Sequence, residues 1–156
     1  MIKSIGFTGT SSGMTPVQLH KLHEVLKQQF VDGAEFHHGD CVGADEAAHF
    51  LALSVGYIVH IHPPSNAKAR AFCKVGSVGE IHPTQPYLIR NREIVAASQM
   101  LIATPREFKE LYHYSGTWAT VRYGHTAKLP VTIIWPDSRT SVYEPGINLR
   151  TEEYEE

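Results

Sequence analysis

The sequence predicts an α/β fold, a parallel sheet of about five or more strands with helices on both faces. Five short apolar runs have the length of strands, and most of them are separated by segments with helical periodicity. Strands that alternate with helices form parallel βαβ units. The unusual polar residues follow these runs, at the carboxyl edge where such sheets bind ligands. The runs span residues 4–8, 34–38, 57–61, 99–103 and 131–135.

Four segments of helical periodicity complete the pattern, over residues 16–30, 44–55, 87–97 and 118–127. Thr15 is a suitable N-cap before Pro16, which is favoured at the first helical position. Gly56 follows the second segment, where glycine commonly ends a helix. Beyond the last strand the chain is polar and lacks clear periodicity. We therefore expect one domain over residues 1–136 and an extended or partly mobile polar tail over residues 137–156.

The composition indicates a single globular domain. The 156 residues are 42% hydrophobic and 19% charged, and the net charge of −2 gives no global basic field for nucleic acid. Cys41 and Cys73 are the only cysteines, and without a CxxC spacing they indicate a reducing compartment. The first residues lack the apolar core of a signal peptide, and no apolar stretch could span a bilayer. We expect a cytoplasmic protein without a membrane partner.

The loop after the first predicted strand, residues 6–15, is rich in glycine, serine and threonine. Its glycines do not have the spacing of a GxGxxG motif. It either holds an anion through backbone N–H groups or only connects the strand to the helix. The residues that would hold the anion are Thr8, Gly9, Thr10 and Ser11.

The loop after the second predicted strand contains Gly39, Asp40, Gly43 and Asp45. The two glycines allow the backbone to approach a ligand closely. Asp40, at the strand end, is placed to accept hydrogen bonds from sugar hydroxyls or a base. Asp45 lies near the start of a helix, where it either caps the helix or complements its dipole.

Two further segments are suited to phosphate. Arg90, Asn91 and Arg92 stand at the start of a predicted helix, and arginine binds phosphate in a bidentate manner. The alternative is a solvated surface with salt bridges. The turn Ser115-Gly116-Thr117 opens the last predicted helix, whose first N–H groups and dipole favour an anion. Serine and threonine are also ordinary helix caps, so the turn alone does not decide between the two roles.

Ten histidines raise the question of a metal site. Successive residues of one strand point to opposite faces, so the candidates do not form a clearly convergent set. They are His37, His38, Asp40, Cys41, His60 and His62. His60 and His62 are two residues apart and could share a face, which leaves the question open. We expect no metal and no resident cofactor, and we expect His20, His23 and His49 on helices to be surface or packing residues.

Three segments, taken together, resemble the SLOG superfamily, the Rossmann-like fold of DNA-processing protein A (DprA) and the Lonely Guy phosphoribohydrolases. They are HHGDCVGADEAAHFLAL at residues 37–53, RNREIVAASQMLIATP at 90–105 and SGTWATVRYGHTAKLPVTIIWP at 115–136. The similarity runs from about residue 5 to residue 136, and the pattern is most similar to small stand-alone bacterial and phage members.

The resemblance implies a nucleotide-type ligand across the carboxyl ends of the sheet. Its phosphate would lie on the turn at residues 115–117 and on the first loop, with Arg90 or Arg92 supplying positive charge. Gly39 and Asp40 would lie near the sugar. The resemblance also implies a homodimer.

One departure from the family pattern concerns catalysis. Lonely Guy enzymes carry a catalytic glutamate in PGGxGTxxE, and Thr120 stands at that position here. A threonine cannot act as the carboxylate base. Hydrolysis would then depend on Asp40, Asp45 or Glu93.

We therefore expect a nucleotide-binding sensor or sequestering module. The first alternative is a nucleoside 5′-monophosphate phosphoribohydrolase, an N-glycosidase. The second is a DprA-like protein that binds single-stranded DNA, which basic and aromatic side chains support in part. Those side chains are Arg90, Arg92, Arg106, Lys109, Tyr112, Tyr114 and Arg122.

Overall fold

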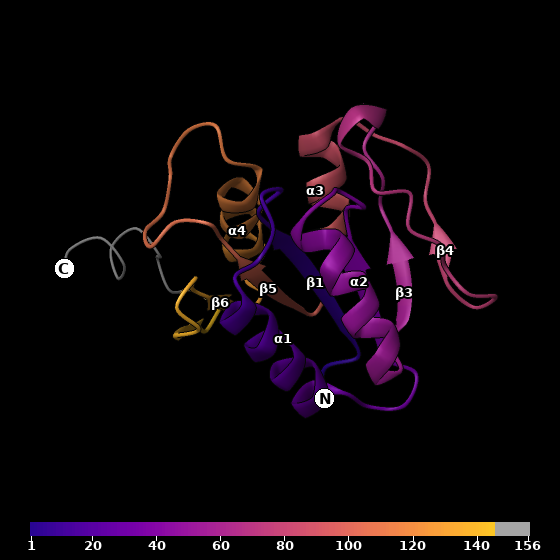
Figure 1. Cartoon of the computed structure of the whole chain (residues 1–156), viewed down its shortest axis with the longest axis horizontal. Helices are drawn as coiled ribbons and strands as arrows, with labels where there is room; N and C mark the ends of the chain where they lie inside the picture. The colour runs from indigo at the N-terminus through magenta and orange to yellow at the C-terminus, as the bar shows by residue number, and fades with distance from the viewer. Residues whose placement is uncertain (146–156) are drawn as a thin grey trace.

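A central sheet organises the molecule (Figure 1), and the computed structural model describes residues 1–145 of the chain. The strands are β1 (Ser4–Gly9), β2 (Glu35–His38), β3 (Ile58–Ile61), β4 (Glu80–Ile81), β5 (Met100–Thr104), β6 (Val131–Ile134) and β7 (Thr140–Tyr143). They form one seven-stranded sheet in the order β4-β3-β2-β1-β5-β6-β7. β1 to β6 are parallel and β7 is antiparallel to β6. The predicted Rossmann-like α/β sheet is confirmed.

The helices are α1 (Pro16–Gln29), α2 (Ala44–Val55), α3 (Tyr87–Ala96) and α4 (Gly116–Thr126), with a short 3₁₀ turn η1 (Ala67–Ala69). Thr15 caps α1 as predicted, because its side chain accepts from the Gln18 N–H while the Gln18 side chain bonds the Thr15 backbone. Gly56 ends α2 with its N–H bonded to the Ala52 carbonyl. None of the helices in residues 1–145 has the length and apolar character needed to cross a membrane.

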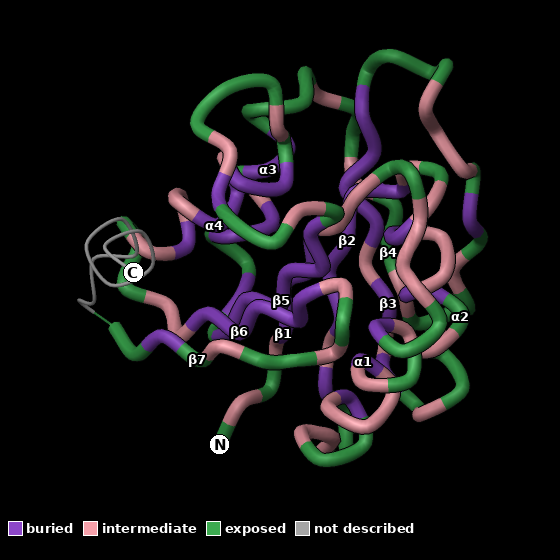
Figure 2. The backbone as a smooth tube through the Cα atoms, turned by 60° about the vertical axis from the view of Figure 1, so that its left-hand side comes forward, coloured by how far each residue is buried: buried purple, intermediate pink, exposed green. Residues whose placement is uncertain are grey.

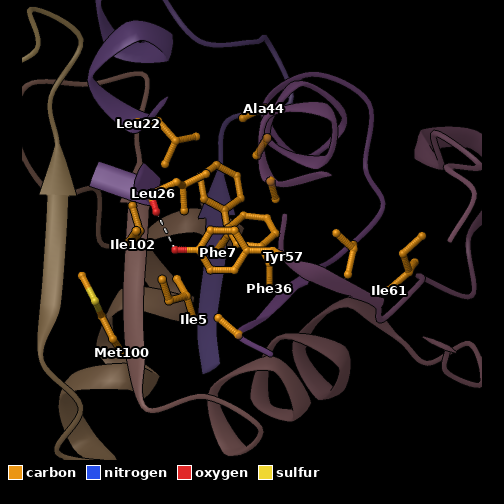
Figure 3. Close-up of a cluster of buried hydrophobic side chains, with 14 of the residues drawn as sticks. Ile5, Phe7, Leu22, Leu26, Phe36, Ala44, Tyr57, Ile61, Met100 and Ile102 are labelled. Carbon is orange, nitrogen blue, oxygen red and sulfur yellow. Dashed lines mark hydrogen bonds between the residues drawn. The ribbon is translucent and has the colours of Figure 1, made fainter. Parts of the chain in front are cut away.

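Two apolar clusters lie on opposite faces of the sheet. On one face, α1 and α2 cover Phe7 and Phe36, and the Tyr57 hydroxyl donates to the Leu26 carbonyl at 2.7 Å (Figure 3). On the other face, Trp118 of α4 packs in a second cluster with residues of β5 and β6. The alternation along β5 explains the two layers, because Ile102 belongs to the first cluster and its neighbour Leu101 to the second. Figure 2 shows the buried strands enclosed by exposed loops.

Two strands were not predicted from the sequence. β4 has only two residues, both exposed, and pairs with β3 at one edge of the sheet. β7 lies within the stretch expected to be a polar tail, and it extends the sheet beyond β6 at the other edge. The remainder of that expected tail, residues 146–156, lies outside the described residues.

Candidate functional site

A cavity of about 620 Å³ opens at the carboxyl ends of β1 and β2, between the start of α3 and the start of α4. Four segments that the sequence singled out meet there. The predicted ligand residues that line it are Thr8, Gly9, Ser11, Gly39, Arg90, Asn91, Ser115, Gly116 and Thr117. A smaller cavity of about 190 Å³ adjoins it and includes Thr10. Asp40 and Arg92 line neither cavity.

The first loop is held against the start of α2. The Ala44 N–H donates to the Thr10 carbonyl at 3.0 Å, and the Thr10 N–H donates to the Thr104 carbonyl at 3.2 Å. Gly43 has φ +90°, and a Cβ at this position would overlap the backbone of Ser11. Glycine is therefore required here for both its conformation and the close approach of the loop.

The turn that opens α4 forms one wall of the cavity. Ser115 is the N-cap, and its side-chain oxygen accepts from the Trp118 N–H at 3.2 Å. The N–H groups of Gly116 and Thr117 precede the first intrahelical bond, in which Ala119 donates to the Ser115 carbonyl. These first-turn amides and the helix dipole make the wall receptive to an anion.

Thr120 lies one turn further along α4 and is completely buried. Its hydroxyl donates to the Gly116 carbonyl at 2.7 Å. At the position where the resemblance implies a catalytic glutamate, this chain therefore has a hydroxyl bonded to its own helix.

Arg90 is only 4% exposed and ties two strand ends together. Its Nη1 donates to the Gly39 carbonyl and, at 3.1 Å, to the His62 carbonyl. Its Nε donates to Asn91 Oδ1 at 2.7 Å. A Cβ on Gly39 would overlap this guanidinium, so the glycine allows the arginine to reach the strand ends. Arg90 thus places positive charge beneath the cavity while most of its donors are engaged by the protein.

Arg92 is exposed and lies elsewhere, with its guanidinium 4.5 Å from the centre of the Tyr123 ring. Of the two arginines that the sequence offered for phosphate, only Arg90 lines the cavity. Successive residues of a helix face different directions, which explains the difference between them.

Asp40 is fully buried and directed away from the cavity. Its φ is +57°, and its carboxylate accepts from Arg70 Nε at 2.8 Å and from the Cys73 N–H at 2.9 Å. The Asp40 carbonyl also accepts from the Ala71 N–H at 2.7 Å. In this structure Asp40 anchors the segment that follows β3.

Asp45 is the carboxylate that lines the cavity among the described residues. It is 6% exposed, and its Oδ2 accepts from the Cys41 N–H at 3.2 Å. Burial raises the pKa of the Asp45 carboxyl to about 6, and the nearby Arg90 guanidinium opposes part of that rise. The sequence offered Asp45 as a helix cap or dipole partner and, with Asp40 and Glu93, as a possible catalytic carboxylate; of these three, only Asp45 lines the cavity.

The outer part of the cavity is aromatic. Tyr87, Tyr112 and Tyr114 line it and are partly or fully exposed. Arg122 also lines it but forms an ion pair with the buried Glu110 and donates to the Leu111 carbonyl at 3.1 Å. Its charge is therefore balanced inside the protein, whereas the tyrosine rings present flat surfaces on which a base could stack.

Solved structures of the same architecture provide an independent comparison. A molybdenum cofactor binding protein from Rippkaea orientalis superimposes with a TM-score of 0.63 at 21% identity, over 86% of this chain and 77% of that one. The molybdenum cofactor carrier protein of Chlamydomonas reinhardtii gives 0.60 at 20% identity, over 85% and 76%. DNA processing protein A from Helicobacter pylori, a single-stranded DNA binder, gives 0.60 at 18% identity, over 83% of this chain and 64% of that one.

The chain has a SLOG-type Rossmannoid fold. This confirms the resemblance at the level of architecture. No family model and no curated protein matches the sequence. At identities of 18–21% the structural likeness concerns the fold alone.

Six of the ten histidines of this SLOG-type fold lie apart from the cavity, in two groups on opposite faces of the sheet, whereas His113 lines the cavity. In the first group, the Asp40 N–H donates to His38 Nδ1 at 2.9 Å, so the ring proton resides on Nε2, which lies 3.0 Å from His49 Nδ1. Burial holds the pKa of His38 well below its ordinary value. Both rings are buried and hydrogen-bonded, which agrees with the packing role expected for His49.

The second group, which we call the edge cluster, consists of His37, His60, His62 and His82 with Glu35, Glu80 and Glu93. The register pairs His37 with His60 and His60 with Glu80. Burial lowers the pKa of His62 to about 3, assisted by the neighbouring His82. Glu93, a sequence candidate for catalysis, lies here with its Oε1 3.7 Å from His62 Nδ1 and does not line the cavity.

Proposed function

We propose that the cavity binds a nucleotide or a nucleotide-derived small molecule, with its phosphate on the first turn of α4. The observation that carries the proposal is the position of Ser115, Gly116 and Thr117 in the wall of a 620 Å³ cavity at the carboxyl edge of the sheet. Ligands of open α/β sheets bind at this edge, and a helix N-terminus favours an anion. The tyrosines at the outer part of the cavity would stack on the base.

Binding without hydrolysis is the form of the proposal that the geometry favours. Thr120 replaces the family glutamate and bonds to the Gly116 carbonyl. Asp40 and Glu93 lie outside the cavity lining, so N-glycosidase activity would depend on Asp45. The molybdenum cofactor carrier among the structural neighbours supports a binding role for this fold. We propose that the chain acts as a cytoplasmic sensor or sequestering module.

Gly116 offers a sharp test of the phosphate position. It is exposed, its φ lies outside the left-handed region, and a Cβ there would meet only Asn91 Nδ2, at 3.7 Å. An aspartate at this position would place negative charge at the proposed phosphate while complementing the helix dipole. Gly116→Asn has nearly the same shape without the charge and serves as the matched control.

The measurement is calorimetric titration of the protein and its two variants with AMP, ADP-ribose and cyclic nucleotides. We expect at least one of these to bind, and Gly116→Asp to weaken it about tenfold more than Gly116→Asn, since one charge contact is worth roughly 1–2 kcal/mol. Binding by none of them, or equal binding to the two variants, would refute the proposal. Free base released from a nucleoside monophosphate, detected by chromatography, would show hydrolysis instead.

A second candidate function is binding of single-stranded DNA. The segment of residues 105–115 exposes Phe108, Tyr112 and Tyr114, and Arg106 and Lys109 are exposed beside them. Aromatic and basic side chains together bind single strands by stacking and charge neutralisation. Affinity for an oligonucleotide that falls steeply with salt and is lost in a Phe108→Ala, Lys109→Ala double variant would support it.

The homodimer implied by the family resemblance stays a prediction. Leu88 and Ile89 of α3 are about half exposed, at 49% and 47%, and a second copy could cover them. Sedimentation of the intact chain and of a Leu88→Asp, Ile89→Asp variant tests this prediction directly.

A further inference from the structure

β3 and β4, which carry His60 and Glu80 of the edge cluster, form one edge of the sheet (Figure 1). The rings of the edge cluster lie close together: His37 and His60 have centroids 4.8 Å apart, and His62 and His82 are stacked at 4.2 Å. The nucleotide cavity does not involve these side chains. Buried polar groups normally have hydrogen-bond partners. A cluster of four imidazoles and three carboxylates should therefore satisfy its donors and acceptors internally or with a ligand.

Several atoms of the edge cluster do not have such partners. Among the described residues, both ring nitrogens of His60, together with His62 Nδ1 and His82 Nε2, are buried without a hydrogen bond. His60 Nδ1 lies 3.7 Å from Glu80 Oε1, and His82 Nε2 lies 3.8 Å from the same oxygen. His60, Glu80 and His82 each offer one ligand atom, and the three atoms lie within 4.8 Å of one another.

We propose that His60, Glu80 and His82 bind a divalent transition-metal ion of the zinc type. A zinc ion lies about 2.0–2.2 Å from nitrogen and oxygen donors, which places tetrahedral donors roughly 3.3–3.6 Å apart. The two distances of 3.7 and 3.8 Å need only a small inward movement to match. Two imidazoles and one carboxylate suit zinc, cobalt or nickel, whereas magnesium prefers oxygen donors.

His60 has a second feature of a metal ligand. Its other nitrogen, Nε2, faces Glu35 Oε2 at 3.5 Å, so a carboxylate stands behind the ring on the side away from Glu80. Metal-ligating histidines commonly direct their second N–H to a carboxylate, which fixes the tautomer and orients the ring. Glu35 would serve His60 as this positioning residue. The Glu80 side chain is 63% exposed, so solvent or an external ligand can reach a fourth coordination position.

Two other groups of possible ligands fit a metal less well. Glu35, His37 and His60 also have donor atoms within 4.8 Å, but both nitrogens of His37 are engaged, by Glu35 at 3.1 Å and by His62 at 2.9 Å. His38, His49 and Cys73 form the third such group. There the hydrogen bond from His38 to His49 already uses the facing nitrogens. The assignment to His60, Glu80 and His82 therefore follows from which donors are left without a partner.

The test uses the full chain without an affinity tag, stripped with a chelator and titrated with Zn²⁺ by calorimetry and with Co²⁺ by visible absorption. We expect one ion per chain, a higher Tm with Zn²⁺ and no effect of Mg²⁺. Glu80→Gln and His82→Asn should each weaken Zn²⁺ binding at least about tenfold. Because the Glu80 and His82 side chains are 63% and 29% exposed, we expect both metal-free variants to keep the far-UV spectrum and Tm of the metal-free protein.

Two controls make the assignment specific. His20→Asn removes an ordinary surface histidine whose Nε2 lies 3.1 Å from Glu24, and it should leave Zn²⁺ affinity unchanged. His37→Asn removes one residue of the alternative group formed by Glu35, His37 and His60. It should change the Zn²⁺ affinity less than about threefold, far below the loss expected for a ligand. Each of three results would overturn the proposal. They are fewer than one Zn²⁺ ion bound per chain at 100 μM Zn²⁺, affinity retained in His82→Asn, and affinity lost in His37→Asn but not in His82→Asn.

Discussion

The buried carboxyl of Asp45 leads to a prediction about stability and pH. Asp45 is 6% exposed at the start of α2, and burial raises its pKa from 3.8 to about 6. The folded state therefore holds a proton on Asp45 over a pH range in which the unfolded chain has released it. Asp45→Asn keeps an oxygen that can accept from the Cys41 N–H but removes the charge.

The size of the effect follows from the shift. A change from 3.8 to about 6 corresponds to roughly 3 kcal/mol at about 1.4 kcal/mol per pKa unit. Since the folded pKa is raised, Asp45 contributes its full stability below pH 3.8, and this contribution is lost as the pH rises through 6. The variant has no such loss. We expect Asp45→Asn to be close to the parent protein in stability at pH 3.5 and roughly 3 kcal/mol more stable at pH 7.

Urea unfolding of both proteins between pH 3.5 and 8, followed by circular dichroism, measures this difference. Asp32→Asn, a change at an exposed aspartate, controls for the loss of one negative charge from the molecule. A variant that is less stable than the parent at pH 7, or a difference that does not depend on pH, would show that the protein solvates the Asp45 carboxylate adequately. Asp45 would then not be a carboxyl whose pKa is raised by burial.

Two further predictions concern the cavity walls. Arg90→Ala should lower the free energy of unfolding by roughly 3 kcal/mol, because two buried carbonyls lose a charged donor, whereas Arg92→Ala should cost less than about 1 kcal/mol and leave nucleotide affinity unchanged. Urea titrations of the two variants compare them directly, and equal losses would contradict the assignment. Gly43→Ala should cost roughly 2–4 kcal/mol, from a strained φ and overlap with Ser11. Gly13→Ala has a similar φ of +95° but nothing within 4 Å, so its smaller loss of stability isolates the overlap, and equal losses would show that the overlap costs nothing.

The main elements of the fold could be predicted because local signals and burial agree. β1 and β5 are apolar runs at the centre of the sheet, and α1 begins at the Thr15–Pro16 signal. β4 could not be predicted, since two exposed residues leave no pattern of buried side chains and the strand exists only by pairing with β3. β7 alternates partly buried and exposed residues over four positions, which is too short a pattern in a polar stretch to indicate a strand.

For the site, the sequence predicts which loops meet but not the direction of each side chain. The carboxyl ends of parallel strands share an edge, so loops distant in sequence converge at the cavity. Asp40 is at that edge as expected, but a left-handed φ of +57° turns its carboxylate toward Arg70 and the Cys73 N–H. Nothing in the local sequence indicates this turn, because both partners lie 30 or more residues away.

The two groups of histidines show which structural feature separates a packing histidine from a candidate ligand. His38 and His60 stand on neighbouring strands, and both rings are largely buried. A donor on one side of the His38 ring and an acceptor on the other fix the ring proton on Nε2. A metal there would therefore have to displace existing hydrogen bonds. His60 has no such bonds among the described residues, and its two nitrogens face carboxylates at 3.5 and 3.7 Å. That difference depends on Glu80 and His82, which β4 brings alongside β3, so spacing along the first three strands could not reveal it. A metal at His60 would therefore also explain why a strand of only two exposed residues holds its place at the edge of the sheet.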